Sequence, residues 1–106
     1  MKVLLVGSGG REHALALKLS ESLRLSHLYV APGNAGTAEL GQNIAIKETD
    51  ISSLLQFVGD ERIDLTIVGP EVPLVQGIVD EFKARGFAII GPSKKGAQLE
   101  GSKAWA

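Results

Sequence analysis

The sequence of 106 residues contains no cysteine, which excludes disulfide bonds, thiolate metal ligands and cysteine nucleophiles. It has no apolar run near the ~18 residues of a membrane-spanning helix, and its first residues have a strand pattern rather than that of a signal peptide. Acidic and basic residues are interleaved and sum to a net charge of -1, whereas nucleic-acid binders usually carry a basic face. We therefore expect a cytoplasmic protein without nucleic-acid or membrane partners.

Short apolar clusters rich in valine, isoleucine and leucine alternate with segments in which apolar residues recur three or four positions apart. Continuous apolarity is typical of strands covered on both faces, as in a parallel sheet, and the longer spacing is typical of helices. The sequence predicts strands at 3–6, 28–31, 44–46, 65–68 and 87–90, and helices at 11–19, 51–59 and 75–85.

This alternation predicts an α/β fold of the Rossmann-like type, with a doubly wound parallel five-stranded sheet flanked by helices. Right-handed crossovers favour the strand order 3-2-1-4-5, with the first strand at the centre. Asp50 is suited to cap the second helix, and Gly86 to end the third. We expect residues 1–101 to form this domain.

The end of the sequence predicts a short capped helix at 93–100 and the start of another at 101–106, where Trp105 is followed by one residue. We interpret residues 102–106 as the truncated beginning of a linker or of a following domain in a longer protein. Ser93 is expected to act as a helix cap and the two lysines after it to be solvated. Phosphate or nucleotide attraction is the alternative for these three residues.

The most informative loop follows the first predicted strand and contains the glycines at 7, 9 and 10. A strand that leads through a glycine turn into a helix brings together free backbone amides and the positive end of the helix dipole, which favours a phosphate. Gly9 and Gly10 are the candidate donors, with the Arg11 amide beside them; a tight turn without ligand is the alternative. Loops at 32–37, 69–74 and 91–95 also follow strands, at the edge where such sheets bind ligands.

A dinucleotide-binding fingerprint would require a third glycine and an acid about 20 residues further on. Glu12 stands at the third glycine position, and the second predicted strand ends in Ala31-Pro32 without an acid at its tip. We therefore expect one phosphate rather than a pyrophosphate, and NAD or FAD binding is the less favoured alternative. In a first helical turn, structural roles are favoured for Glu12 and His13.

Further polar residues near this edge have two possible roles each. Glu71, beside Pro70, is suited to accept two hydroxyls of a ribose, or else to cap the helix that follows. Asn34, close to Gly36, can bond a ligand or supply the hydrogen bonds of a turn. The two histidines are far apart in sequence and have no acidic cluster beside them, so no metal site is expected.

Five motifs together resemble the amino-terminal domain of the phosphoribosylamine–glycine ligases, also called glycinamide ribonucleotide synthetases. The resemblance spans nearly the whole chain, and the motifs stand in the family's order. They are VGSGGREHA at 6–14, APGNAGT at 31–37, GPEVPL at 69–74, GPS at 91–93 and LEGSK at 99–103.

The resemblance implies an enzyme of de novo purine biosynthesis that joins glycine to 5-phosphoribosylamine, giving glycinamide ribonucleotide, ADP and phosphate. In such ligases the ATP-grasp and carboxy-terminal domains make most of the contacts to ATP and to Mg²⁺ or Mn²⁺. ATP phosphorylates glycine, and the amine of phosphoribosylamine then attacks the acyl phosphate. The amino-terminal, pre-ATP-grasp domain helps to hold the phosphoribosyl substrate and packs against its ATP-grasp domain. We expect this chain alone to hold no cofactor, to contain no catalytic residue and to be inactive.

The expected substrate contacts lie in three of the loops, with the phosphate at the glycine turn and the ribose near Glu71. The candidate substrate-binding residues are Gly9, Gly10, Arg11, Asn34, Gly36, Pro70 and Glu71.

Three other interpretations stay open. Another ATP-grasp ligase or a carboxylase shares the domain plan, but not the combination of REHA with PGNAGT. A nicotinamide oxidoreductase would bind NAD(P) rather than ribose 5-phosphate. A noncatalytic sugar-phosphate sensor would have a stop codon after Ala106, where a ligase gene would continue into an ATP-grasp pattern.

Overall fold

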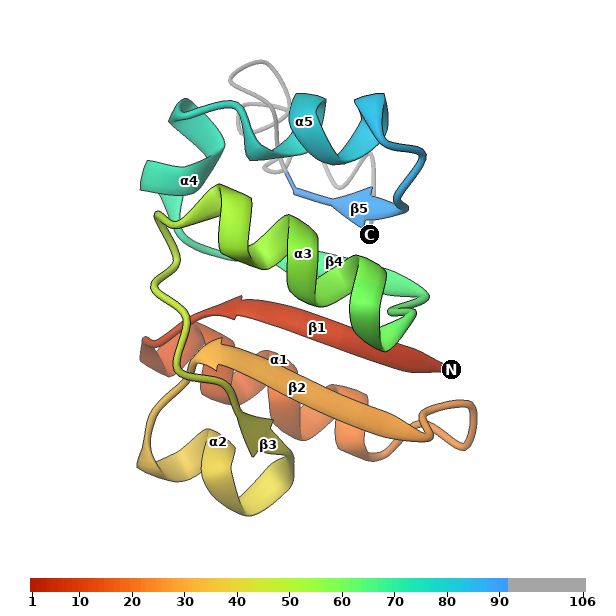
Figure 1. Cartoon of the computed structure of the whole chain (residues 1–106). Coiled ribbons are helices and arrows are strands. Elements are labelled where there is room, and N and C mark those ends of the chain that lie inside the picture. Colours follow the sequence, from red (N-terminus) through yellow and green to blue (C-terminus); the bar gives the residue numbers. More distant parts are fainter. Residues whose placement is uncertain (92–106) are drawn as a thin grey trace, which may run out of the picture.

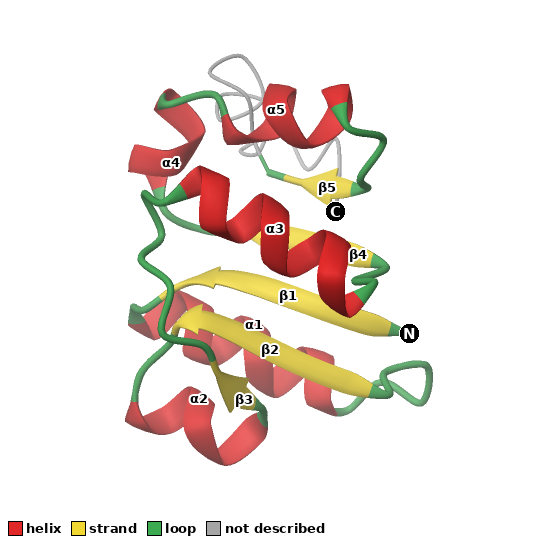
Figure 2. Ribbon diagram, in the orientation of Figure 1, coloured by secondary structure: helices red, strands yellow, loops and turns green. Residues whose placement is uncertain are grey.

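The computed structural model describes residues 1–91, which form a five-stranded, all-parallel sheet with helices on both faces (Figures 1 and 2). The strand order is β3-β2-β1-β4-β5, so the predicted α/β class and the predicted order are confirmed. The elements are β1 (Lys2–Gly7), α1 (Gly10–Ser20), β2 (His27–Pro32), α2 (Ala35–Leu40), β3 (Gln42–Asn43), α3 (Ile51–Glu61), β4 (Leu65–Val68), α4 (Glu71–Val75), α5 (Ile78–Ala84) and β5 (Ile89–Ile90).

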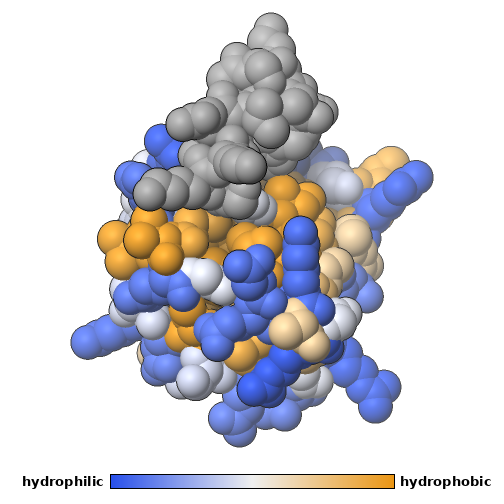
Figure 3. Space-filling view, turned by 90° about the horizontal axis from the view of Figure 1, so that it is seen from above, coloured by the Kyte–Doolittle hydropathy of each residue, from blue (hydrophilic) through white to orange (hydrophobic). Residues whose placement is uncertain are grey.

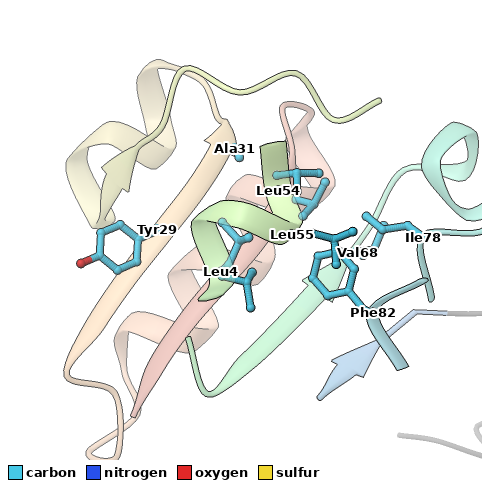
Figure 4. Packing of buried hydrophobic residues seen from close by; sticks show 10 residues of the cluster. Leu4, Tyr29, Ala31, Leu54, Leu55, Val68, Ile78 and Phe82 are labelled. Carbon is cyan, nitrogen blue, oxygen red and sulfur yellow. The ribbon is translucent and has the colours of Figure 1, made fainter. Parts of the chain in front are cut away.

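The core has two parts, one on each face of the sheet, because successive side chains of a strand point to opposite faces. On one face Leu4 and Val68 pack with residues of α3 and α5, among them Leu54 and Phe82 (Figure 4). On the other face, residues of β1 and β2 pack against α1 around Ala16. Residues 3–6 of β1 are all buried, as predicted for a strand covered on both sides.

Two predicted helix ends are confirmed. The Asp50 carboxylate accepts a hydrogen bond from the Ser53 amide at 3.2 Å, which caps α3. Gly86 follows the last residues of α5 with φ +78°, a left-handed conformation that glycine adopts without steric cost.

The predicted helix at 75–85 is wrong in its extent, because the structure has two helices there, α4 and α5. Gly77 separates them with φ +88° and serves as the N-cap of α5. The apolar spacing that suggested one helix includes Val75, whose side chain is 75% exposed and lies outside the core. The helical spacing of apolar residues therefore runs across the break between α4 and α5, and Gly77 is the one sequence signal of that break.

The third strand also differs from its prediction at 44–46, since β3 is Gln42–Asn43. Ile44 and Ile46 lie in the segment after the strand, where their side chains pack against the core cluster. Their apolar pattern reflects this packing and not a strand. Helix α2 was not predicted, because its sequence is rich in residues typical of turns. The predicted helices at 93–106 and the domain boundary after residue 101 lie outside the described residues. Among residues 1–91, no helix is long and apolar enough to cross a membrane.

Candidate functional site

The loops after β1, β2 and β4 meet at one edge of the sheet. The Gly33 amide donates to the Gly7 carbonyl at 2.9 Å, and the Gly69 amide donates to the Val6 carbonyl at 3.3 Å. Strand order reverses between β1 and β4, which makes this the topological switch point where open α/β sheets bind ligands. The structure thus brings together three of the four loops singled out from the sequence.

The glycine turn leads directly into the first turn of α1. Its Gly9 amide donates to the Glu12 carboxylate at 3.1 Å, and the His13 amide donates to the Gly9 carbonyl at 3.2 Å. Helix geometry leaves the intervening first-turn amides, including those of Gly10 and Arg11, without an intrahelical acceptor. Gly10 and Arg11 are exposed, and a Cβ built on Gly10 would meet no atom within 4 Å. An anion can therefore approach these amides from solvent.

Glu12 is the buried polar residue of this turn, with only 5% of its surface exposed. Its carboxylate accepts a hydrogen bond from the backbone amide of the N-cap residue Gly9, which is the half of a capping box that needs no N-cap side chain, so the structural role favoured from the sequence is confirmed. A Cβ on Gly7 would overlap this carboxylate, and a Cβ on Gly69 would lie 2.5 Å from its Oε1. Glycines of two different loops thus leave the space that the Glu12 side chain fills.

Asn34 ties the loop after β2 to the glycine turn. Its Oδ1 accepts from the Thr37 amide at 2.9 Å, which caps α2. Its Nδ2 donates to the carbonyls of Ser8 at 2.8 Å and Gly9 at 3.2 Å. Both amide hydrogens are used within the protein, so the turn role weighed from the sequence is present, and a ligand contact stays a prediction.

Gly36, in the first turn of α2, lies against the ring of His13. A Cβ there would lie 2.9 Å from ring atoms of the exposed histidine, so a side chain would displace the His13 ring from its place against α2. The structure therefore gives Gly36 a packing role, and its proposed contact with substrate stays a prediction.

Thr37 and Asn43 support Asn34 and were missed as site residues by sequence reasoning. The buried Thr37 hydroxyl accepts a hydrogen bond from the backbone amide of Asn34 at 2.8 Å, and Asn43 Nδ2 donates to the backbone carbonyl of Asn34 at 2.8 Å. The spacing Asn-x-x-Thr is a capping signal that could have revealed Thr37. Asn43 lies in a short exposed edge strand, and no local pattern marks it.

Pro70 and Glu71 begin α4 immediately after Gly69. Pro70 is the N-cap, and Glu71 is the first helical residue, with an exposed side chain. An acid at this position also complements the helix dipole, so the helix-start alternative and the ribose contact are both compatible with its place. The fourth loop is described only at Gly91, which lies near Leu74 and Val68; Ser93 and the two lysines after it are outside the described residues.

Comparison with known proteins gives one consistent family. Residues 1–100 match the family model described as phosphoribosylglycinamide synthetase, N domain. Phosphoribosylamine–glycine ligase of Escherichia coli K12 is 60% identical over 107 residues, covering 99% of this chain and 25% of the relative. The same-named protein of Caldanaerobacter subterraneus subsp. tengcongensis is 56% identical over 106 residues, covering 100% of this chain and 25% of the relative.

A solved structure gives the same result for the fold. The crystal structure of phosphoribosylamine–glycine ligase from Thermotoga maritima has a TM-score of 0.60 and 25% identity, covering 93% of this chain and 21% of that chain. The chain spans about a quarter of the length of the curated relatives it matches. The resemblance seen in the five motifs is confirmed, and the chain belongs to the family of phosphoribosylglycinamide synthetase N domains.

Proposed function

We propose that this chain is the phosphoribosyl-binding domain of a phosphoribosylamine–glycine ligase, an enzyme that joins glycine to 5-phosphoribosylamine in purine biosynthesis. The observation that carries the proposal is the open first turn of α1 at the switch point of the sheet, beside the loops of β2 and β4. The names of the relatives supply the two compounds joined. Residues 1–101 would form this domain, and 102–106 would begin the next part of the ligase.

The phosphate group is assigned to the first turn of α1. The Gly10 and Arg11 amides are free to donate, and the helix dipole adds a favourable interaction with negative charge. Gly9 contributes through its lack of a side chain, because its amide is already bonded to Glu12. The exposed Arg11 side chain adds a positive charge near the same turn.

The ribose is assigned to the start of α4. Pro70 fixes the backbone before Glu71, whose exposed carboxylate can accept hydrogen bonds from two neighbouring hydroxyls. Asn34 and Gly36 form the adjoining wall: Asn34 holds the β2 loop against the glycine turn, and Gly36 permits α2 to lie close to α1.

ATP would supply the phosphoryl group that activates glycine. Residues 1–91 contain no group of three His, Cys, Asp or Glu arranged to hold a metal ion, so the described residues do not fit a Mg²⁺ or Mn²⁺ site. We assign ATP, the metal and glycine to the remaining three quarters of the ligase. This chain binds and orients the phosphoribosyl group, and no chemical step is assigned to it.

Isothermal titration of the chain with ribose 5-phosphate, ribose and NAD(P) tests the proposal. Ribose 5-phosphate should bind more tightly than ribose, because the phosphate provides most of the contacts, and more tightly than NAD(P). Tighter binding of NAD(P) would contradict the proposal and favour a nicotinamide-binding domain.

The variant Gly10→Val localises the phosphate. The added side chain has open space around it, so the fold should persist while the methyl groups block the amides, and binding should fall at least about tenfold. Gly59→Val is the matched control, since Gly59 lies near the end of α3, at the opposite edge of the sheet. Unchanged binding by Gly10→Val would place the phosphate elsewhere.

A further inference from the structure

The Glu12 carboxylate lies between the loops of β1 and β4, against Gly7 and Gly69. It is held there by the Gly9 amide and by the absence of side chains at Gly7 and Gly69. With 5% exposure, it is one of three buried polar or charged residues in the described part of the chain. A fixed anion thus stands at the switch point, beside the amides expected to receive a phosphate.

In a dinucleotide-binding turn, a glycine occupies this position, and a pyrophosphate lies at the helix N-terminus. Here the carboxylate has two opposing effects. It uses the Gly9 amide, which removes one donor from the turn, and it adds a negative charge next to the remaining donors. Each further negative charge on a ligand at this turn is repelled by the carboxylate, which is itself withdrawn from water.

We infer that Glu12 is a specificity-determining residue that restricts this turn to a single phosphate group and disfavours ligands that carry a pyrophosphate. The inference rests on the proposed function, because it concerns the same turn. Glu12 acts by occupying a donor and by its charge, and it need not touch the ligand.

The variant Glu12→Gln separates charge from structure. A glutamine oxygen still accepts from the Gly9 amide, so this hydrogen bond and the packing are retained while the charge is lost. The chain and the variant are titrated with ribose 5-phosphate and with ADP-ribose, which carries a pyrophosphate. The ratio of the two dissociation constants should shift about tenfold towards ADP-ribose, the size expected for one nearby charge.

Two further variants complete the test. Glu81→Gln removes one exposed acidic charge from α5 and should leave the ratio unchanged. Glu12→Gly restores the third glycine and should shift the ratio further. If Glu12→Gly does not fold, Glu12→Gln still tests the inference, because unfolding curves show whether it is as stable as the unmodified chain.

If the role of Glu12 is only structural, Glu12→Gln should have the same ratio of dissociation constants as the unmodified chain. That result would overturn the inference, whereas binding of ribose 5-phosphate in the same experiment would still support the proposed function. Equal affinity of the unmodified chain for both ligands would overturn it as well. If the unmodified chain does not bind ribose 5-phosphate, the proposed function fails and the inference fails with it.

Discussion

One side chain, that of Glu12, accounts for the absence of side chains at two positions far apart in sequence. Gly7 also has a φ of +143°, so a substitution there is strained in its backbone as well as by contact. Gly69 has no such conformation, and the contact with Glu12 Oε1 at 2.5 Å is its main steric obstacle. The two glycines should therefore respond differently when Glu12 is shortened.

Gly69→Ala should lower the free energy of unfolding by about 1–3 kcal/mol, the usual cost of overpacking, because the new methyl group would press on the buried Glu12 side chain. In the background of Glu12→Ala, which removes the obstructing atoms, the same change should cost little, giving a coupling of about 1–2 kcal/mol. Urea unfolding of the two single variants and the double variant measures this coupling.

Gly7→Ala is the control for this cycle, because its positive φ keeps it destabilising in either background. Strictly additive effects of Gly69→Ala and Glu12→Ala would mean that the carboxylate does not occupy the space beside Gly69.

At this scale the sequence predicted a structural role for Glu12 and an amide donor at Gly10, since both follow from rules about the first turn of a helix. The contact of Glu12 with Gly69 could not be predicted, because it joins residues 57 positions apart that meet only when β1 pairs with β4.

Helix α2 owes its position to Asn34, which both caps it and tethers it to the glycine turn. Asn34→Ala removes both functions and should cost about 1–2 kcal/mol of stability. Asn34→Asp retains an oxygen acceptor for the Thr37 amide but loses the two donated hydrogen bonds.

We therefore expect Asn34→Asp to keep most of the helical cap while weakening ribose 5-phosphate binding, because the β2 loop is no longer held and a negative charge is added near the phosphate. Thermal unfolding and titration measure the two effects. Equal stability and equal binding in Asn34→Asp would show that the tether to Ser8 and Gly9 has no role.

Among whole elements, α1, α3, β1, β2 and β4 could be predicted because burial or helical spacing extends over most of their length. The remaining elements are short: β5 and α5 lie within the longer ranges predicted at 87–90 and 75–85, and other determinants fix the rest. β3 has two exposed polar residues and is defined by main-chain pairing with β2. α2 depends on the Asn34 cap, and the separation of α4 from α5 depends on the conformation of Gly77.

Considered as a whole, the molecule has hydrophobic side chains gathered at the end formed by α4, α5 and β5, which Figure 3 views from above. On α4 the exposed apolar residues are Val72, at 55%, and Val75, at 75%. This helix begins with Glu71, a residue of the candidate site. Because the chain spans about a quarter of its relatives, we expect the α4 surface to contact the rest of the ligase.

In a full-length ligase, Val75→Lys should lower kcat/KM by about tenfold or more, because a charge would be placed in an apolar contact. The stability of the isolated chain should be unaffected. Leu23→Lys is the matched control: Leu23 is fully exposed at 104% and lies in the turn between α1 and β2, at the other edge of the sheet. Full activity of Val75→Lys would exclude α4 from the contact.

The space shared by Glu12, Gly7 and Gly69 also limits how such a sequence can diverge. A lineage that gains a side chain at position 69 loses less stability if residue 12 is shortened first, whereas the loss of Glu12 alone leaves both glycines acceptable. The order of substitutions is therefore biased, and a change of the acid before a change of Gly69 is the less costly route.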